Sequence, residues 1–236
     1  MKKIIASFFA LVIIVTLIMV SPIMNVRSIT VNGNERIDEA EILSTADLAG
    51  ATNIFAFSIN TARENLLRNT YIRNVDISRD FFERSLEINI VERQLSAYVR
   101  FRDNTYLFID REGMVLESRT AFIERHPVVE GLRFSEFTVG EYLEVENYNA
   151  LSTMFILSRL FDEFDIEQEI IRIDLARDDE IQFYYANINI QMGSAHNLDL
   201  KIRTLMEILP TLESYKHMGG FLFLEDPLRP RFSLLS

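Results

Sequence analysis

The sequence opens with an apolar run from Ile4 to Val20 that contains no charged residue and follows Lys2 and Lys3. Continued to Met24, it reaches roughly 31 Å as a helix at about 1.5 Å per residue, which matches a hydrocarbon core of about 30 Å. The run therefore predicts a transmembrane helix over residues 4–24. The lysines favour a cytoplasmic start, so we expect residues 1–3 to be a cytoplasmic tail and the rest of the chain to be extracytoplasmic.

A cleavable signal peptide is the competing interpretation of this run. Cleavage requires a small-x-small motif soon after a shorter apolar core. The segment that follows Val20, SPIMN at residues 21–25, contains no such motif. We therefore expect the apolar run to be retained as a membrane anchor.

The composition excludes several classes of function. The chain carries 24 Lys and Arg residues against 35 Asp and Glu residues, a net charge of −11, and this acidity disfavours nucleic-acid binding. It has no cysteine, which excludes disulfides, thiolate metal sites and cysteine nucleophiles. The 48% hydrophobic content favours folded domains, and about 210 residues beyond the anchor suffice for one or two of them.

Residues 26–93 predict the order strand, helix, helix, strand, strand. Residues 26–31 form the first strand and residues 32–34 a turn, and the second helix spans residues 60–69. Val75 and Ile77 alternate with polar residues, as do Leu86, Ile88 and Ile90 beyond a polar turn at residues 80–84. A period of two on both sides of a turn predicts an antiparallel hairpin.

The first helix of this region has a clear start signal. Asp38 stands at the N-cap, Glu41 follows as a capping-box partner, and Ile37 with Ile42 has the spacing of a hydrophobic staple. We expect this helix to run to Ala49 and the glycine that follows to close it.

This order of elements directly after a single anchor resembles a POTRA domain of the FtsQ/DivIB family of bacterial cell-division proteins. The resemblance rests on VRSITVNG at 26–33, the helix that opens at Ile37, YIRNVDI at 71–77 and ERQLSA at 92–97. The family usually has E-R-x-P-x-A in the last of these, so Leu95 stands in the place of a proline. The resemblance implies a POTRA-like domain at residues 25–93, joined directly to an FtsQ/DivIB-type β domain at residues 94–236.

The second domain combines alternating strands with two amphipathic helices, so the fold class is α+β with a mixed β-sheet. Residues 105–110 and 114–116 flank a turn, HPVVEG at 126–131 is similar to the family's L-P-x-I-x-G, and residues 171–175 alternate again. Helices are expected over residues 146–164 and 197–212. Gly193 and Lys201 stand where the family has its glycine and lysine.

Between these two helices the sequence predicts a hairpin with a defined register. A two-residue turn at Ala186 and Asn187 places six apolar side chains on one face of the pair. The expected pairs are Tyr185 with Ile188, Phe183 with Ile190, and Ile181 with Met192.

The apolar stretch FLFL at residues 221–224, stopped by Pro227 and Pro230, has two interpretations. As a core strand it needs no further explanation. As an edge strand it presents unpaired backbone groups to an incoming segment. The resemblance favours partner binding, because family members bind partners near their C-terminal strand. The predicted partner-binding residues are Gly220, Phe221, Leu222, Phe223, Leu224 and Glu225.

No residue pattern predicts catalysis or metal binding. His126, His196 and His217 lack metal-ligand spacing, and a helix cap by Ser194 or Asn197 explains the GSAHN segment better than a nucleophile does. The acidic clusters at 162–165 and 178–180 lack the spacing of a calcium loop, and the eight glycines form no phosphate-binding loop. We expect no cofactor, metal ion or small-molecule substrate.

The resemblance implies a non-enzymatic, single-pass scaffold of the divisome at the septum. The implied partners are bitopic coiled-coil proteins of the FtsL and FtsB/DivIC type, and the implied role is the regulation of septal cell-wall synthesis. An anchor would raise the effective concentration of such membrane-bound partners. Two alternatives remain: a POTRA-containing envelope chaperone or adaptor, and an anchored cell-wall enzyme.

Overall fold

The computed structural model describes residues 2–48, 50, 52–120, 127–166 and 169–235. The chain divides into two compact units, Met1–Arg93 and Gln94–Ser236. Each unit has its own hydrophobic core.

The first unit begins with helix α1 (Lys2–Val20), whose side chains from Lys3 onward are exposed. Among the described residues it is the one helix long and apolar enough to cross a membrane, judged by length and composition alone. The α-helix ends at Val20, before the predicted Met24. Ser21 then caps the short 3-10 helix η1 (Pro22–Met24), its Oγ accepting a hydrogen bond from the Ile23 amide at 3.3 Å.

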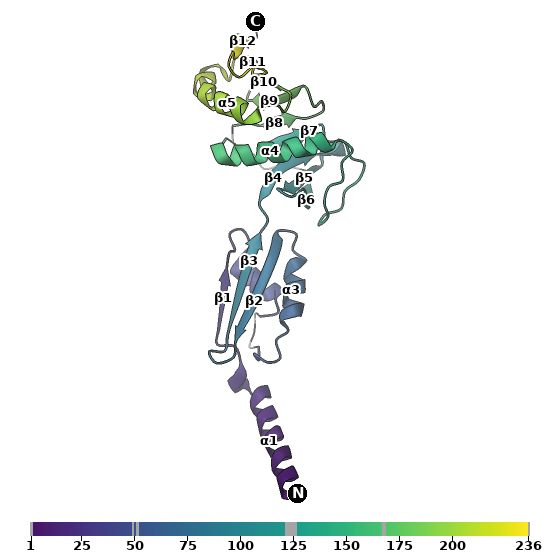
Figure 1. Ribbon diagram of the computed structural model, residues 1–236, viewed down its shortest axis with the longest axis vertical. Helices are drawn as coiled ribbons and strands as arrows, with labels where there is room; N and C mark the ends of the chain where they lie inside the picture. Colours follow the sequence, from purple (N-terminus) through teal and green to yellow (C-terminus); the bar gives the residue numbers. More distant parts are fainter. Residues whose placement is uncertain (1, 49, 51, 121–126, 167–168, 236) are drawn as a thin grey trace. The chain divides into compact units, whose positions relative to one another are not determined.

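The rest of this unit has the predicted order of strand, helix, helix, strand, strand. Its elements are β1 (Ser28–Asn32), α2 (Glu39–Thr45), α3 (Ile59–Leu67), β2 (Ile72–Asp80) and β3 (Ser85–Glu92). The sheet order is β1-β3-β2, with β1 parallel to β3 and β2 antiparallel to it, and α3 lies against one face (Figure 1). Val75 lies opposite Ile90 and Ile77 opposite Ile88, so the predicted hairpin is confirmed.

Helix α2 departs from its prediction at both ends. Asp38 is the N-cap residue, but its side chain makes no capping hydrogen bond, and Glu41 accepts one from Asn69 at 3.5 Å instead. The helix ends at Thr45 because Asp47 adopts a left-handed φ of 61° and the Leu48 amide donates to the Leu43 carbonyl, as in a Schellman motif. Ala49, the predicted end, lies outside the described residues.

The loop between β1 and α2 is fixed by the end of β3. The Glu92 carboxylate accepts hydrogen bonds from three successive backbone amides: Oε1 lies 3.1, 3.2 and 3.0 Å from the amide nitrogens of Glu35, Arg36 and Ile37. Oε2 lies 3.0 Å from the Arg36 nitrogen. Gly33 opens this loop at a φ of 80°, where an added Cβ would lie 2.1 Å from the Ile90 oxygen. Only glycine fits there.

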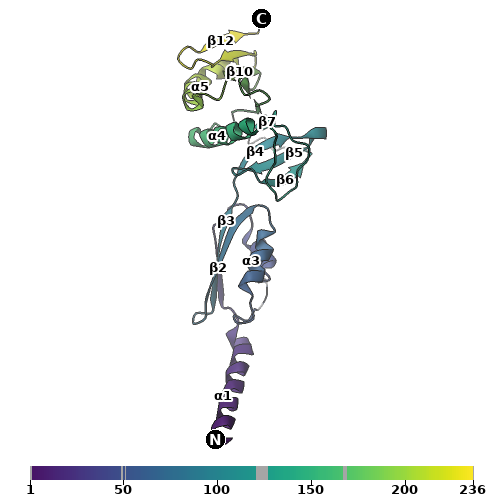
Figure 2. The same cartoon turned by 45° about the vertical axis from the view of Figure 1, so that its right-hand side comes forward.

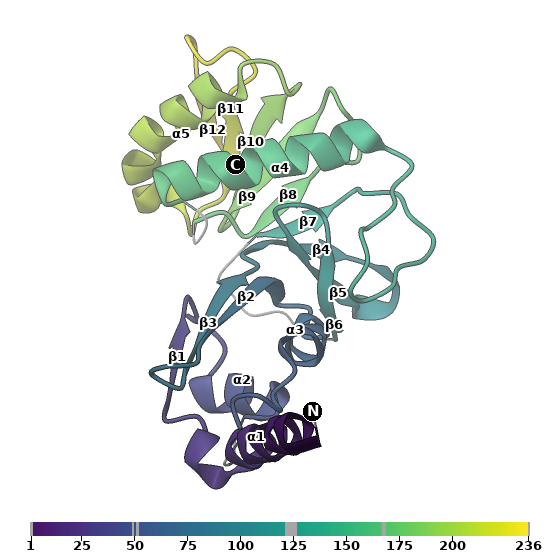
Figure 3. The ribbon, with the colours of Figure 1, turned by 60° about the horizontal axis from the view of Figure 1, so that its bottom comes forward.

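In the described part of the second unit, nine strands form one sheet, and the long helices α4 and α5 lie on one of its faces (Figure 3). The spatial order of the strands is β12-β11-β10-β9-β8-β7-β4-β5-β6. Its elements are β4 (Leu95–Arg100), η2 (Arg102–Asn104), β5 (Tyr106–Asp110), β6 (Val115–Arg119), β7 (Val128–Glu130), α4 (Tyr148–Phe164), β8 (Arg172–Asp174), β9 (Ile181–Tyr185), β10 (Ile188–Gly193), α5 (Leu198–Leu212), η3 (Glu213–Tyr215), β11 (Gly220–Phe223) and β12 (Arg231–Leu234).

The two units together have the predicted α+β fold class. Leu95, which replaces the family's usual proline, begins β4 opposite Asp110. The first position of a strand tolerates proline, so either residue is compatible with this geometry. His126, the first residue of the 126–131 motif, lies outside the described residues.

The β9–β10 hairpin follows its predicted register for two of three pairs. Tyr185 lies opposite Ile188 and Phe183 opposite Ile190. The third pair is wrong, because Ile181 lies opposite Gly193 rather than Met192. A bulge between Gln191 and Gly193 adds one residue to β10 and shifts the register there.

The Glu92 carboxylate provides the first testable prediction. We expect Glu92→Ala to lower the free energy of unfolding of the first unit by about 2 kcal/mol, because three amides lose a charged acceptor together. Hydrogen exchange at the amides of residues 35–37 should become faster. Glu64→Ala, on the exposed side of α3, is the control and should change stability by less than about 0.5 kcal/mol. Unchanged exchange at residues 35–37 would contradict this role.

Candidate functional site

The predicted partner-binding residues lie in and beside β11, near one end of the large sheet. β11 pairs with β10 on one side, in parallel, and with β12 on the other, antiparallel. Of the two interpretations of residues 221–224, the edge strand is therefore wrong, because β12 occupies the edge (Figure 2). This pairing does not test whether residues 220–225 bind a partner, which stays a prediction.

The sequence reasoning missed β12 because it treated Pro227 and Pro230 as the end of regular structure. Asp226 and Pro227 begin a tight turn, in which the Arg229 amide donates to the Asp226 carbonyl at 3.1 Å and the Leu228 amide to Asp226 Oδ1 at 3.1 Å. Asp followed by Pro is a signature of the first two positions of a type I turn. That signature, followed by the short strand RFSL, is the signal that could have predicted a returning strand.

The side chains of β11 divide between two faces of the sheet. Leu222 is buried, as is Leu224 just beyond the strand, and both join the core of the second unit. Phe221 and Phe223 are half-buried on the opposite face, with ring centroids 6.4 Å apart. The guanidinium of Arg231 on β12 lies 5.4 Å from the centre of the Phe223 ring. This face is an aromatic and cationic surface directly beside the sheet edge.

The backbone groups on the outer side of β12 pair with no other strand within the described residues. The Leu235 amide donates to the Gly219 carbonyl at 3.3 Å, so Leu235 faces β11. Because backbone groups alternate in direction along an antiparallel strand, those of Ser233 also face β11 and those of Phe232 and Leu234 face outward. All four residues of β12 are exposed. The edge thus offers two residues whose N–H and C=O groups face away from the sheet.

A buried lysine fixes the helix that leads to this edge. Lys201 in the first turn of α5 is 3% exposed, and its Nζ donates to the carbonyl oxygens of Met192 at 2.7 Å and Ser194 at 2.9 Å. Burial lowers the pKa of this ammonium, and the negative charge of Glu225 opposes that effect. An added Cβ on Gly193 would lie 2.9 Å from Glu225 Cγ, so the bulge of β10 and the end of β11 are in close contact.

The C-terminal end of α5 is joined to the sheet by Tyr185. Its hydroxyl donates a hydrogen bond to the carboxylate of Glu213, which also forms an ion pair with Lys216. Burial of the ring and the negative Glu213 raise the pKa of Tyr185 above its ordinary value. Together with Lys201, this contact attaches both ends of the crossover helix to β9 and β10.

The other residues considered in the sequence do not gather into one cluster in the part of the chain that the structure describes. His196 and His217 are exposed, and within the described residues no three His, Asp or Glu side chains gather to hold a metal ion. The predicted cap of α5 is not formed: Asn197 is the N-cap residue without a side-chain bond, and Ser194 Oγ lies 3.5 Å from the His196 amide.

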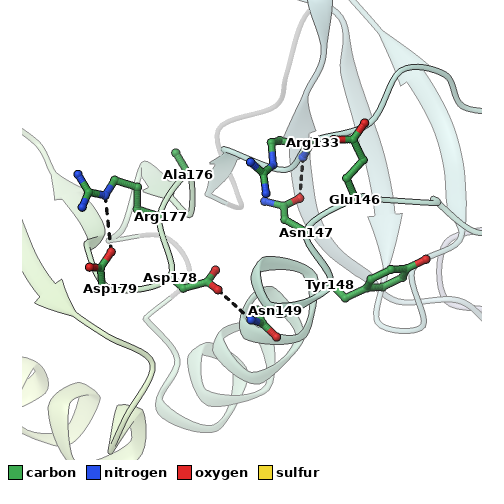
Figure 4. A pocket seen from close by; sticks show the side chains of 9 residues that line it. All are labelled: Arg133, Glu146, Asn147, Tyr148, Asn149, Ala176, Arg177, Asp178 and Asp179. Carbon is green, nitrogen blue, oxygen red and sulfur yellow. Dashed lines mark hydrogen bonds and ion pairs between the residues drawn. The ribbon is translucent and has the colours of Figure 1, made fainter.

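An open pocket lies beside the start of α4 and includes part of the acidic cluster at 178–180 (Figure 4). Asp178 accepts a hydrogen bond from Asn149 at 2.8 Å, and Asp179 lies 3.6 Å from Arg177. Asn147 bonds the Arg133 amide through Oδ1 at 2.8 Å. These polar groups satisfy one another, which is the ordinary arrangement of a surface turn.

Lys201 provides a test of this arrangement. We expect Lys201→Ala to lower the free energy of unfolding of the second unit by about 2 to 4 kcal/mol, because two carbonyl groups lose their donor and a cavity remains. Arg203→Ala, two positions along α5 at an exposed ion pair with Asp199, should cost less than about 1 kcal/mol. Equal losses in chemical denaturation would contradict the role of Lys201.

Tyr185 predicts a dependence of stability on alkaline pH. Above about pH 10 the unfolded chain loses the phenol proton while the native state keeps it, so this group's contribution to stability falls as pH rises. Tyr185→Phe removes the contribution, and the difference in unfolding free energy between the two proteins should change through this range. Urea denaturation at pH values from about 9 to 11 measures it. Parallel pH curves would argue against the raised pKa.

The chain is similar to cell-division proteins along most of its length. The model of the FtsQ-type POTRA domain matches residues 24–93. Cell division protein DivIB of Clostridium tetani is 30% identical over 204 residues, a match that covers 86% of this chain and 76% of that protein. DivIB of Clostridium botulinum is 28% identical over 222 residues, covering 93% of this chain and 86% of the relative.

A shorter match is to a protein named FtsQ. Cell division protein FtsQ of Agrobacterium fabrum is 30% identical over 92 residues, which cover 39% of this chain and 28% of that protein. The POTRA match agrees with the first unit, and the DivIB matches extend across the second. This chain therefore belongs to the FtsQ/DivIB family of bacterial cell-division proteins.

Proposed function

We propose that this cell-division protein is a non-enzymatic, single-pass scaffold of the divisome. α1 anchors it with the N-terminus in the cytoplasm, and both folded units lie outside the cytoplasm at the division septum. Its partners are bitopic coiled-coil proteins of the FtsL and FtsB/DivIC type. Through them it regulates septal cell-wall synthesis.

The exposed edge of β12 is the observation that carries this proposal. An extended partner segment can pair with the outward backbone groups of Phe232 and Leu234 and extend the sheet by one strand. Backbone pairing of this kind supplies affinity, while side chains beside the edge supply specificity. The half-buried rings of Phe221 and Phe223 and the cation of Arg231 are placed to provide that specificity.

Residues 220–225 act in this scheme as the support of the edge and as part of its recognition surface. Leu222 and Leu224 hold β11 in the core, which fixes β12 beside it. Phe221 and Phe223, on the same strand β11, face away from that core and are available to a partner. The predicted site thus extends from β11 onto β12.

The α1 anchor supports the choice of membrane-bound partners. Two proteins confined to one bilayer meet at a much higher effective concentration than they do in solution, so a short strand contact is sufficient for stable association. This argument favours bitopic partners over soluble client polypeptides.

A proline at the edge tests the proposal. Leu234→Pro removes an outward N–H group and leaves the groups of Ser233 that face β11, and an edge strand tolerates proline. We expect capture of the two coiled-coil partners in a pull-down to fall by about tenfold, which corresponds to about 1.4 kcal/mol. Phe223→Lys, which changes only the aromatic surface, should also weaken capture.

Leu234→Ala is the matched control, because it removes the same side chain and keeps the N–H group. It should lose less capture than Leu234→Pro. Full capture by a folded Leu234→Pro protein would remove the β12 edge from the proposal, and full capture by Phe223→Lys would remove the predicted residues of β11.

A further inference from the structure

Three exposed phenylalanines gather at one end of the first unit. Phe82 at the tip of the β2–β3 turn is 98% exposed, Phe81 beside it is 48% exposed, and Phe55 in the loop before α3 is 38% exposed. The rings of Phe55 and Phe81 stack with centroids 5.1 Å apart. Two separate loops therefore form one aromatic surface, the Phe55–Phe81–Phe82 cluster, and the guanidinium of Arg79 lies 5.4 Å from the centre of the Phe81 ring.

Both loops are hydrogen-bonded to the last turn of α1 or to the segment that follows it. Asn53 Nδ2 donates to the carbonyl oxygens of Met19 at 2.9 Å and Ser21 at 3.2 Å, and Asn53 Oδ1 accepts from the Phe55 amide at 2.9 Å. On the other loop, the Arg84 guanidinium donates to the carbonyl oxygen of Ile23. The two loops that carry the aromatic cluster are thus hydrogen-bonded to the last residues of α1 and to η1.

Side-chain hydrogen bonds stabilise the β2–β3 turn that carries Phe81 and Phe82. Asp80 Oδ1 accepts hydrogen bonds from the amides of Phe82 at 2.7 Å and Glu83 at 2.9 Å, which fixes the turn. A fully exposed phenylalanine gains nothing from folding in water, because its apolar surface stays hydrated. At this turn the ring is available to an apolar environment outside the chain.

We infer that the Phe55–Phe81–Phe82 cluster lies in the boundary between headgroups and acyl chains of the bilayer that α1 crosses. The inference rests on the proposed anchor. Interfacial aromatic and aliphatic side chains bury several ångströms deep at this boundary. Ile23 in η1, which is 69% exposed, lies on the chain between the anchor and the cluster and adds to the contact.

Apolar burial drives this contact, because the charges nearby are of both signs. Asp80 and Glu83 stand on the same turn as Arg84, and Arg27 donates its amide to the Arg84 carbonyl at 2.8 Å. The chain as a whole is acidic. We therefore expect contact with zwitterionic lipid that changes little with salt, unlike a polybasic attachment.

Because the chain has no tryptophan, Phe82→Trp introduces a single fluorescent reporter. The full-length variant is reconstituted in phosphatidylcholine vesicles, with and without phosphatidylcholine brominated on its acyl chains. Val91→Trp is the matched control: Val91 is 48% exposed and pairs with Asn74, about 20 Å along β2 from Asp80. Emission from Phe82→Trp should lie at shorter wavelength and be quenched by brominated lipid, and emission from Val91→Trp should not.

Each other result overturns the inference in a distinct way. Unquenched emission at the wavelength of the control, from protein that floats with the vesicles, would overturn the lipid contact and leave the anchor intact. A shift to shorter wavelength without quenching would mean that the ring packs against protein, which also overturns it. Protein that fails to float would overturn the anchor and the lipid contact together.

Discussion

The parallel pairing of β10 with β11 is the constraint on which the C-terminal edge depends. Parallel strands cannot be joined by a tight turn, so the chain must cross the sheet between them. α5 makes this crossover, and Lys201 bonds its first turn to the carbonyl groups of Met192 and Ser194. β11 can pair with β10 only when α5 is seated on the sheet, and β12 pairs with β11. The buried ammonium of Lys201 is thus one of the contacts that fix the crossover on which the exposed edge depends.

Charged side chains in both units satisfy backbone groups at the ends of strands. Glu92 binds three amides of the loop after β1, and Asp110 accepts from the amides of Glu112 and Met114 after β5. Lys201 does the same for carbonyl groups. In a chain without cysteine, such bonds take the place of disulfides in fixing loops. These bonds fix the loops and strand ends of each compact unit.

The alternation of apolar residues predicted both hairpins, because a period of two leaves one face for the core. The same pattern could not predict the bulge of β10, since one extra residue at Gly193 changes the register without changing which residues are apolar. It also missed β12. Its residues are exposed on both faces, so the strand carries no burial pattern, and its existence depends on pairing with β11.

The sequence by itself determined the apolar helix, the POTRA order of elements, the α+β class and the family, because these follow from local periodicity and from motifs that are contiguous in the chain. Only the tertiary structure decided which strand forms the edge, what Lys201 and Glu92 bind, and that the loops of Phe55 and Phe82 meet beside α1. These features join residues far apart in the sequence. Their partners are fixed by strand pairing and by the need to satisfy buried backbone groups, neither of which leaves a local pattern.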